Sequence, residues 1–452
     1  MAAVDPAVPH PSLARRLLGL APILCLAAWP VGTCLACPSL PPQEAQALSL
    51  ATVVARVQDC HPDVRAAAAA LAVATADVRT AGQLPNPQLT LGAGGVGRRI
   101  GSGSPWSKTF DHQARIDQVV ERGGKPALRQ ASAEAAARAS RADLDEADRQ
   151  SRIAAARAYY DLAAALARRQ ELATSVALND ESRRVLDRRA RAGDAAPLDA
   201  VRFGVEATRV QADLTQATAD IRGLRLQLAT LIGAEDQADA LTPAPDPAFA
   251  SAVPPPVPDV DWRADVVAAQ ARVAAAEQAQ ALAAAQRTRD LGVGVGYSRY
   301  PVSEANPSGT GNTVSVSVTV PLFVRHAYEG ETARAAADLR VAEEALRKVR
   351  LAAQVELERA RADWEAADAR YRLVVEQLLP GAERVAAGAE LAYSRGASGV
   401  LDVLDARRSL RAAHVERIAA EAERAKAAAQ LDGAFQRPGP APALPSSSRV
   451  PP

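Results

Sequence analysis

The chain reads RAGDAAPLD at residues 191–199 and SRGASGVLD at residues 394–402, and these two stretches decide its fold. In each copy a glycine precedes a Leu-Asp pair, and each copy lies between long, alanine-rich helical stretches. Each half of the chain also carries two short segments in which apolar and polar residues alternate. A pattern that recurs in this way indicates a duplicated unit. We therefore predict two copies of a helix–strand–strand–helix repeat.

The composition suits thin helical layers rather than bulky cores. Of the 452 residues only 4% are aromatic, and Met1 is the only methionine. Lys and Arg exceed Asp and Glu by a single charge, so no nucleic-acid partner is expected. The five histidines are scattered, and the sequence contains neither a Cys/His metal spacing nor a nucleophile elbow. We expect no enzyme activity, no metal site and no cofactor.

The N-terminus has the pattern of an export signal. Arg15-Arg16 is followed by a short apolar run at 17–28 and by small residues near 32–36. The apolar run is shorter than the roughly 20 residues that a membrane-spanning helix needs. We predict that residues 1–36 are a signal peptide.

The cysteines leave two alternatives open. Cleavage before Cys37 would remove Cys25 and Cys34, and the remaining Cys37 and Cys60 allow one disulfide but no disulfide framework. The alternative is lipidation of Cys37 or Cys34, although Cys34-Leu-Ala-Cys37 is a poor match to a lipobox.

Breaker residues divide the rest of the chain into repeats. The first repeat spans 45–235 and the second 260–436, with a Pro-, Ala- and Asp-rich linker at 236–259. A Pro/Ser tail at 437–452 is predicted to be disordered. The expected helices span 45–82, 126–191, 197–232, 265–289, 329–395 and 400–435.

Four segments have the period of two that is typical of strands. The clearest places valines on one face and hydroxyl side chains on the other: Val314, Val316, Val318 and Val320 against Thr313, Ser315, Ser317 and Thr319. Glycines alternate with valines at 292–296, which fits the inward face of a tight barrel better than a dinucleotide loop, because no helix follows directly. The predicted strands span 88–98, 109–119, 290–299 and 313–323.

Helix length sets the arrangement. The helix predicted at 126–191 is on the order of 100 Å long at 1.5 Å per residue, which is too long for a globular domain. We expect each long helix to form an antiparallel hairpin with two shorter helices stacked end to end. Pro380-Gly381 should kink the second long helix. That helix also carries a heptad seam typical of coiled coils, formed by Leu357, Ala360, Trp364, Ala367, Tyr371, Val374 and Leu378.

Four strands of about ten residues are long enough to cross a bilayer, but they cannot close a barrel. Because an open sheet edge in lipid leaves backbone groups unpaired, we expect several copies to share one barrel. The valines should face lipid, and Asp111, Arg115 and Asp117 should face a water-filled lumen whose mixed charges give little ion selectivity. The alternative is a soluble sheet packed on helices. Trp106, Phe110, Tyr297 and Tyr300 are candidates for an aromatic girdle.

Several motifs resemble those of the TolC-type outer-membrane efflux channels. They are the duplicated tip, Leu84-Pro-Asn-Pro87 before the first strand, Pro321-Leu322 at the fourth, and the run from Asp402 to Ala406. The resemblance covers nearly the whole mature chain. It implies a homotrimer with a twelve-stranded β-barrel in outer-membrane lipid and an α-helical tunnel below it, an α+β membrane protein. It also implies a periplasmic membrane-fusion adaptor protein and an inner-membrane pump, of the RND type, as partners.

The segment 117–125 is more similar to the branch that serves heavy-metal exporters of the cobalt-zinc-cadmium kind than to the other branches of the family. Two departures from the family pattern stand out. The second tip carries Asp405 where the first has Arg202, so the acidic pair occurs once per chain, and Pro380 has no counterpart in the first half.

Asp402 and Asp405 match the aspartates that line the periplasmic aperture in the family. They are three residues apart, so they lie on one helix face, and a trimer would place six carboxylates around one constriction. Such a ring favours cations and repels anions. The alternative is an acidic surface pair, or for Asp402 a charge favoured at a helix start.

The tips themselves are candidate adaptor contacts. Gly193 and Gly396 should supply the left-handed backbone that ends a helix, and Leu198 and Leu401 should lie in the next turn. Asp199 belongs to the first tip. The leucines either contact the adaptor or only staple the turn.

We therefore predict a passive exit duct in the outer membrane of a Gram-negative bacterium, with a large periplasmic portion, which passes substrates delivered by a pump. The alternative is a structural periplasmic coiled-coil protein without channel activity.

Overall fold

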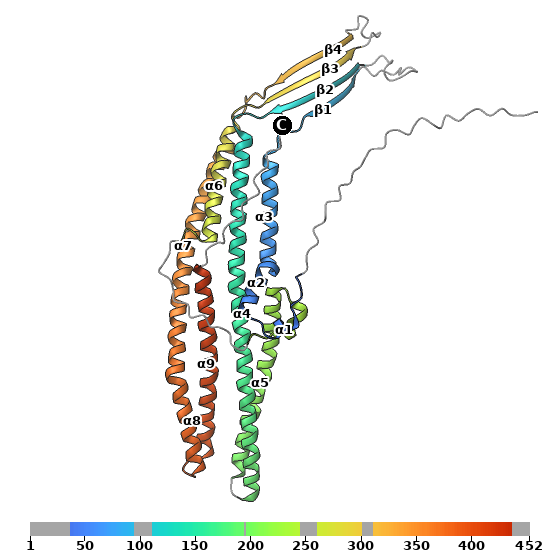
Figure 1. Cartoon of the computed structure of the whole chain (residues 1–452). Helices are drawn as coiled ribbons and strands as arrows, with labels where there is room; N and C mark the ends of the chain where they lie inside the picture. The colour runs from blue at the N-terminus through green and yellow to red at the C-terminus, as the bar shows by residue number, and fades with distance from the viewer. Residues whose placement is uncertain (1–36, 95–110, 194–195, 245–259, 301–310, 436–452) are drawn as a thin grey trace, which may run out of the picture. The chain divides into compact units, whose positions relative to one another are not determined.

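The computed structural model describes residues 37–94, 111–193, 196–244, 260–300 and 311–435 (Figure 1). The predicted signal peptide and C-terminal tail lie outside the described residues, as do Cys34, Trp106 and Phe110. The chain divides into two units, Met1–Pro38 and Ser39–Pro452, and the elements below all belong to the second.

The duplicated plan is confirmed. The first repeat contains α1 (Pro42–Gln46), α2 (Leu50–Cys60), α3 (Pro62–Ala81), β1 (Gln88–Gly94), β2 (Asp111–Val120), α4 (Lys125–Ala192) and α5 (Pro197–Ile232). The second contains α6 (Ala264–Ala285), β3 (Leu291–Tyr300), β4 (Gly311–Thr319), α7 (Glu329–Leu373), α8 (Leu379–Ser394) and α9 (Val400–Phe435). The long helix α4 packs against both α3 and α5, and α6 and α9 both pack against α7. Each long helix is thus covered by two shorter ones, as expected.

The helix expected over 45–82 is broken into three. His61 has an extended backbone, with φ −63° and ψ 131°, because the proline that follows disfavours helical geometry before it. The imidazole of His61 accepts a hydrogen bond from the backbone N–H of Asp63 and so caps α3. Ser49 caps α2 in the same way by accepting from Thr52.

Residues 236–244, the start of the predicted linker at 236–259, form part of the core instead. A short 3₁₀ helix spans Glu235–Ala240, and Leu241 behind it is fully buried. Leu48 donates a backbone hydrogen bond to Thr242 and accepts one from Ala244, both 2.9 Å long. The alanine and proline content of this segment is typical of a linker. The segment instead packs into a buried hydrophobic cluster that includes Val53, Val57, Tyr159, Leu162, Leu228 and Ile232.

The second long helix changes its hydrogen-bonding pattern next to Pro380. A π-helical turn spans Val374–Leu378 between α7 and α8, and the N–H of Leu379 donates to the carbonyl of Val374. Proline has no N–H, so the carbonyl of Glu376 lacks its usual intrahelical donor. The wider turn before the proline accommodates that loss. The kink expected at Pro380-Gly381 stays a prediction.

Within the described residues the sheet has four antiparallel strands in the order β1-β2-β3-β4. The β2–β3 pair joins the two repeats, with Ala114 opposite Tyr297. The fourth strand was predicted to reach residue 323 but ends at Thr319. Pro321, two residues further on, has no N–H to donate to a strand ladder. The pairing puts the leucines, Ile116 and most of the valines on one face, and Ser, Thr, Gly and most of the charged residues on the other. Val119, opposite Gly292, and Arg299, opposite His112, are exceptions.

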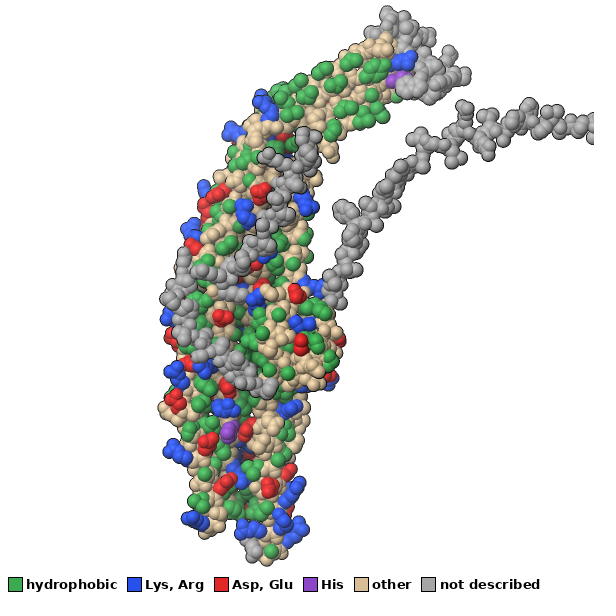
Figure 2. Space-filling view, viewed as in Figure 1, with side chains coloured by type: hydrophobic (Ala, Val, Ile, Leu, Met, Phe, Trp, Pro, Cys, Tyr) green, Lys and Arg blue, Asp and Glu red, His purple; other side chains and the backbone are tan. Residues whose placement is uncertain are grey.

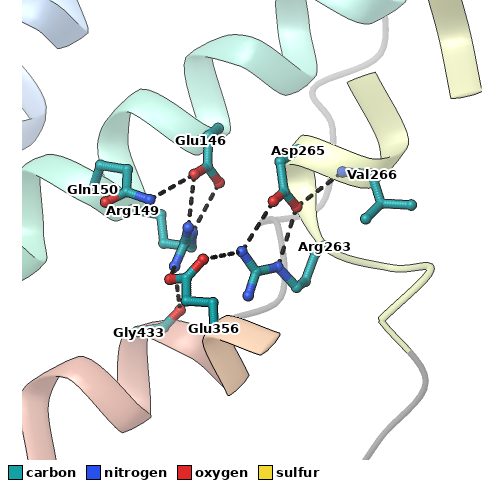
Figure 3. Close-up of polar contacts among 8 residues, drawn as sticks. All are labelled: Glu146, Arg149, Gln150, Arg263, Asp265, Val266, Glu356 and Gly433. Atoms are coloured by element: carbon teal, nitrogen blue, oxygen red, sulfur yellow. Dashed lines mark hydrogen bonds and ion pairs between the residues drawn. The ribbon is translucent and has the colours of Figure 1, made fainter. Parts of the chain in front are cut away.

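A buried ion network connects the two repeats (Figure 3). Arg149 of α4 and Arg263, just before α6, both bind the carboxylate of Glu356 on α7, at 3.1 and 2.7 Å. Each arginine also has a carboxylate of its own: Glu146 at 2.7 Å from Arg149, and Asp265 at 3.0 Å from Arg263. The two guanidinium groups are 3% and 1% exposed, so the charges compensate one another inside the helical layers.

Glu356 is the shared partner, and its pKa reflects that position. Burial alone would raise the pKa of this carboxyl, but the hydrogen bond from Arg263 and the charges of Arg149 and Arg263 outweigh it. The pKa is therefore lowered from its ordinary value near 4.5. A lowered pKa means that the stabilisation is present above about pH 4.5 and is lost as the pH falls through the folded-state value.

Replacing this shared carboxylate should destabilise the fold in a pH-dependent way. We expect Glu356→Gln to lower the free energy of unfolding by about 2–3 kcal/mol at pH 7, because two buried arginines lose their common partner. The loss relative to the unchanged chain should shrink as the pH falls below 4.5. Thermal unfolding followed by circular dichroism at pH 7 and pH 4 measures both effects. Glu358→Gln, on an exposed position of the same helix, is the control. Equal destabilisation by the two variants would contradict the assignment.

Candidate functional site

The two helical tips have the conformation that their glycines predict. Gly193 ends α4 with φ 85°, and Gly396 follows α8 with φ 73°, both in the left-handed region. Leu198 and Leu401 are 55% and 52% exposed. Their side chains therefore present apolar surface at the tips instead of packing fully into the turns.

The predicted aperture residues lie in the first two turns of α9. Asp402 is exposed, and its carboxylate accepts a hydrogen bond from the N–H of Gly399 at 3.1 Å, so it caps the helix. The side chain of Asp405 is 76% exposed and forms a 3.4 Å salt bridge with Arg408. Asp199, the corresponding acid of the first tip, pairs with Arg202 at 3.2 Å. Both aperture aspartates thus remain open to solvent in the single chain.

A buried acid next to these aspartates was not predicted from the sequence. Glu206 on α5 has a side chain only 3% exposed and binds two arginines of α9, Arg408 at 2.6 Å and Arg411 at 3.1 Å. Burial alone would raise the pKa of Glu206, but the hydrogen bonds and charges of the two arginines lower it. The cluster joins the hairpin of the first repeat to that of the second.

The sequence did contain a signal for Glu206. Ala200, Phe203, Ala207 and Val210 form a buried stripe along α5, and Glu206 lies within it. A charged residue in an apolar stripe requires a partner of opposite charge. A cleft of about 270 Å³ borders the cluster, lined by residues that include Asn179, Glu206, Glu390, Leu404, Arg407 and His414.

The three charged residues predicted for the lumen lie on the polar face of the sheet. Arg115 and Asp117 form a salt bridge of 2.8 Å, and Arg115 donates to the hydroxyl of Ser317 at 2.6 Å. That hydroxyl belongs to β4, so the arginine side chain crosses β3 to reach it. Asp111 lies on the same face at the far end of β2, opposite Gly94.

Glycine makes this crossing feasible. Gly294 lies opposite both Asp117 and Ser317, and a Cβ there would lie 2.7 Å from the Ser317 hydroxyl and 2.9 Å from the Arg115 guanidinium, and closer still to the Asp117 carboxylate. A Cβ at Gly296 would lie 2.7 Å from the Ser315 hydroxyl. The alternating glycines thus leave room for polar side chains on one face, which fits the interpretation that this face is inward.

The opposite face of the sheet is apolar and exposed. Val314, Val316 and Val318 are 71%, 73% and 64% exposed, and Leu91 of β1 is 71% exposed. Figure 2 shows hydrophobic side chains over the visible part of the sheet. Burying such a surface in water-free surroundings is favourable, at roughly 25 cal/mol per Å². Among the described residues no helix is long and apolar enough to span a membrane.

Two further observations concern cysteines and metals. Cys37 and Cys60 are both disulfide-bonded. Lipidation of Cys37 would need a free thiol, so the lipidation prediction applies only to a chain in which Cys37 is not in a disulfide. Cys34 lies outside the described residues.

Across the described ranges, no three His, Cys, Asp or Glu side chains gather in a way that could hold a metal ion.

Long helical hairpins joined to a four-stranded amphipathic sheet define the fold class of the outer-membrane channels. The chain resembles the outer membrane protein VceC of Vibrio cholerae with a TM-score of 0.70 and 22% identity, over 87% of this chain and 97% of that one. It resembles the outer-membrane channel OprN with a TM-score of 0.72 and 22% identity, over 85% of this chain and 89% of that one. It resembles CusC with a TM-score of 0.71 and 16% identity, over 88% of this chain and 94% of that one. No curated protein matches.

The family model for the outer membrane efflux proteins matches residues 53–234 and 261–435. The chain therefore belongs to the outer membrane efflux protein family. It is the outer-membrane channel component of a tripartite efflux system, with a large periplasmic helical portion, as the sequence predicted. The family is one of channel proteins rather than enzymes.

The close approach at Gly294 should make this glycine sensitive to substitution. We expect Gly294→Ala to displace Asp117 and Arg115 and to lower the stability of the sheet by about 1–2 kcal/mol, since the ion pair and its hydrogen bond to Ser317 are disturbed. Heat-modifiability on gels, which reports folded sheet, measures the effect. Gly92→Ala is the matched control, because its Cβ would meet Gln113 at an ordinary 3.7 Å. Equal heat resistance of the two variants would count against the packing argument.

The Glu206 cluster should couple the two hairpins energetically. In a double-mutant cycle of Glu206→Gln and Arg408→Gln we expect an interaction free energy on the order of 1–3 kcal/mol, because each change alone leaves a charged group without its partner. Denaturant unfolding measures it. Asp213→Asn with Arg408→Gln is the control cycle, since Asp213 is exposed on the same helix. Additive effects in the Glu206 cycle would show that the contact is not coupling the hairpins.

Proposed function

We propose that three copies of this chain form one duct, in which twelve strands close a barrel in the outer membrane and the helical hairpins form a tunnel in the periplasm. One observation carries the proposal: a four-stranded sheet with one exposed apolar face, one polar face, and no strand pairing the outer edge of β1 or β4 among the described residues. An open edge in lipid leaves backbone groups without partners, each at a cost of several kcal/mol. Pairing β4 of one copy with β1 of the next removes every edge.

The Asp402 and Asp405 carboxylates form the selective constriction of this duct. Their support is their exposure, their common helix face and their place near the tip, which leave both groups free to face the lumen of an assembly. Two aspartates from each of three copies attract cations to the opening. The capping bond of Asp402 to Gly399 fixes the position of its carboxylate and is compatible with this role.

The tips dock onto a periplasmic adaptor, and an inner-membrane pump of the RND type supplies the substrate through it. The exposed Leu198 and Leu401 support this, because both lie in the first turn of a helix beside a glycine-ended tip. An adaptor that covers these two leucines would remove their apolar surface from water, which favours docking. The duct itself adds no chemistry, so the pump determines the cargo.

Removing the acidic ring should change conduction. We expect Asp402→Ala with Asp405→Ala to raise single-channel conductance and to weaken block by divalent cations at least several-fold, since a constriction loses its bulk and its charge. Planar-bilayer recording of the purified trimer measures both. Asp338→Ala with Asp363→Ala removes the same charge from exposed positions of α7 and should change neither. Unchanged conductance in the first variant would remove the aperture assignment. A water-soluble monomer that forms no channels would defeat the duct and favour a structural coiled-coil role.

Docking at the tips is tested by proximity. We expect Ala397→Cys, in the second tip, to crosslink to the adaptor in membranes that contain all three components of the system. Ala336→Cys on α7, far from the tips in sequence, is the control. Crosslinking of neither position would mean that the leucines only complete the turns.

A further inference from the structure

Four exposed arginines gather where the sheet meets the helices. Arg122 lies between β2 and α4, Arg287 and Arg289 between α6 and β3, and Arg325 between β4 and α7. Contacts within this junction hold the segments together: Asp290 accepts hydrogen bonds from the backbone of Arg122 at 2.9 Å and from the buried Lys125 at 2.8 Å. Figure 2 shows basic side chains at this level of the molecule.

These arginines differ from most others in the chain. Arginines on the helices commonly form salt bridges with nearby carboxylates, as in the pairs of Arg149, Arg370 and Arg408. Within the described ranges, the guanidinium groups of Arg287, Arg289 and Arg325 form no such bridge. Arg289 instead lies over the ring of Phe323, 5.3 Å from its centre. Asp290 and Glu329 also lie in the junction, and Arg287 interacts electrostatically with Glu329. These two carboxylates do not balance Arg122, Lys125, Arg287, Arg289 and Arg325, so the junction carries a net positive charge.

The apolar face of the sheet continues into the same junction. Beyond the end of β4, Leu322 and Val324 are 70% and 82% exposed, on a segment without regular secondary structure. Phe323 between them packs edge-on against Tyr328, with ring centres 5.3 Å apart. Tyr328 has a left-handed backbone, with φ 63°, so this contact belongs to a sharply defined turn. Leu322 and Val324 thus lie on the same short segment as Arg325.

We propose that this junction, formed by Arg287, Arg289, Arg325, Leu322 and Val324, binds the phosphate groups of anionic phospholipids at the periplasmic surface of the outer membrane. The proposal rests on the barrel of the proposed function, since it places the junction where the strands leave the lipid. Arginine binds phosphate through a fork of N–H donors, and its stem extends along apolar surface while the charge reaches the head groups. Leu322 and Val324 enter the acyl region, in continuity with the valines of β4.

The charge pattern favours a phospholipid over a second protein. Exposed apolar side chains next to a net positive charge match the boundary between acyl chains and phosphates, where both kinds of group are satisfied at once. An acidic protein would satisfy the charges but would need to cover Leu322 and Val324 at the level of the bilayer. Each basic side chain near an anionic surface strengthens binding by about fivefold, so three together strengthen it by about 100-fold.

The test measures lipid retention by the trimer. The full-length channel, purified in detergent, is titrated with dioleoyl phosphatidylglycerol and analysed by native mass spectrometry. We expect Arg287→Gln with Arg289→Gln and Arg325→Gln to weaken binding on the order of 100-fold. Arg334→Gln with Arg347→Gln and Arg359→Gln removes the same charge from exposed positions of α7 and should bind as the unchanged chain does. Inorganic phosphate at the same concentration should not displace the lipid.

A second measurement tests the apolar half of the proposal. A bimane label on Val324→Cys should be quenched by brominated phosphatidylglycerol in vesicles of that lipid, whereas a label on Val355→Cys, an exposed valine of α7, should not. Equal lipid binding by the arginine variants, displacement by inorganic phosphate, or an unquenched label at 324 would each overturn the proposal. Bilayer recordings on the same preparations distinguish a failure of the lipid site from a failure of the proposed duct. A conducting trimer that retains no lipid contradicts only the lipid site, whereas a non-conducting monomer contradicts both.

Discussion

The 68-residue helix α4 takes most of its stability from packing against other helices, and the arrangement of this chain follows from that requirement. α4 is covered by α3 towards the sheet and by α5 towards the tip. Because alanine dominates the contacts, each stretch of interface contributes little, and the helices gain stability from the number of small contacts. Burying a charged side chain costs free energy, so charges are buried only where several compensate one another, as around Glu356 and Glu206.

The sequence predicted the features that depend on periodicity and on breaker residues. Alternation located all four strands, and Gly193 and Gly396 located both tips, because only a residue without a Cβ adopts the left-handed backbone readily. The amphipathic character of the sheet followed from the valines of β4. Element ends were less predictable: β4 stops at Thr319, and α6 ends at Ala285 rather than near 289. Ends depend on local hydrogen bonds, such as those around Asp290, that no periodic pattern records.

What the sequence did not predict are contacts between residues far apart along the chain. Along the chain, the central linker, β3 and β4 lie between Arg149 and Glu356, and also between Glu206 and Arg408. A single sequence gives the helix face of each residue but not which face of another helix it meets. The role of residues 236–244 in the core was missed for the same reason. Its composition is that of a linker, and only its pairing with Leu48 makes it part of the core.

The two repeats are alike in plan, yet their charges at the tips are complementary rather than equal. The first copy buries an acid, Glu206, whereas the second presents Arg408 and Arg411 at a similar distance from its own tip glycine. Two identical hairpins would bring like charges together and repel one another. With acid on one and base on the other, each hairpin favours the opposite repeat over a copy of itself. The same divergence confines the acidic pair to the second repeat, because the first has Asp199 opposite Asp402 but Arg202 opposite Asp405. Duplication thus supplies the length of the molecule, and the differences between the copies determine which surfaces meet.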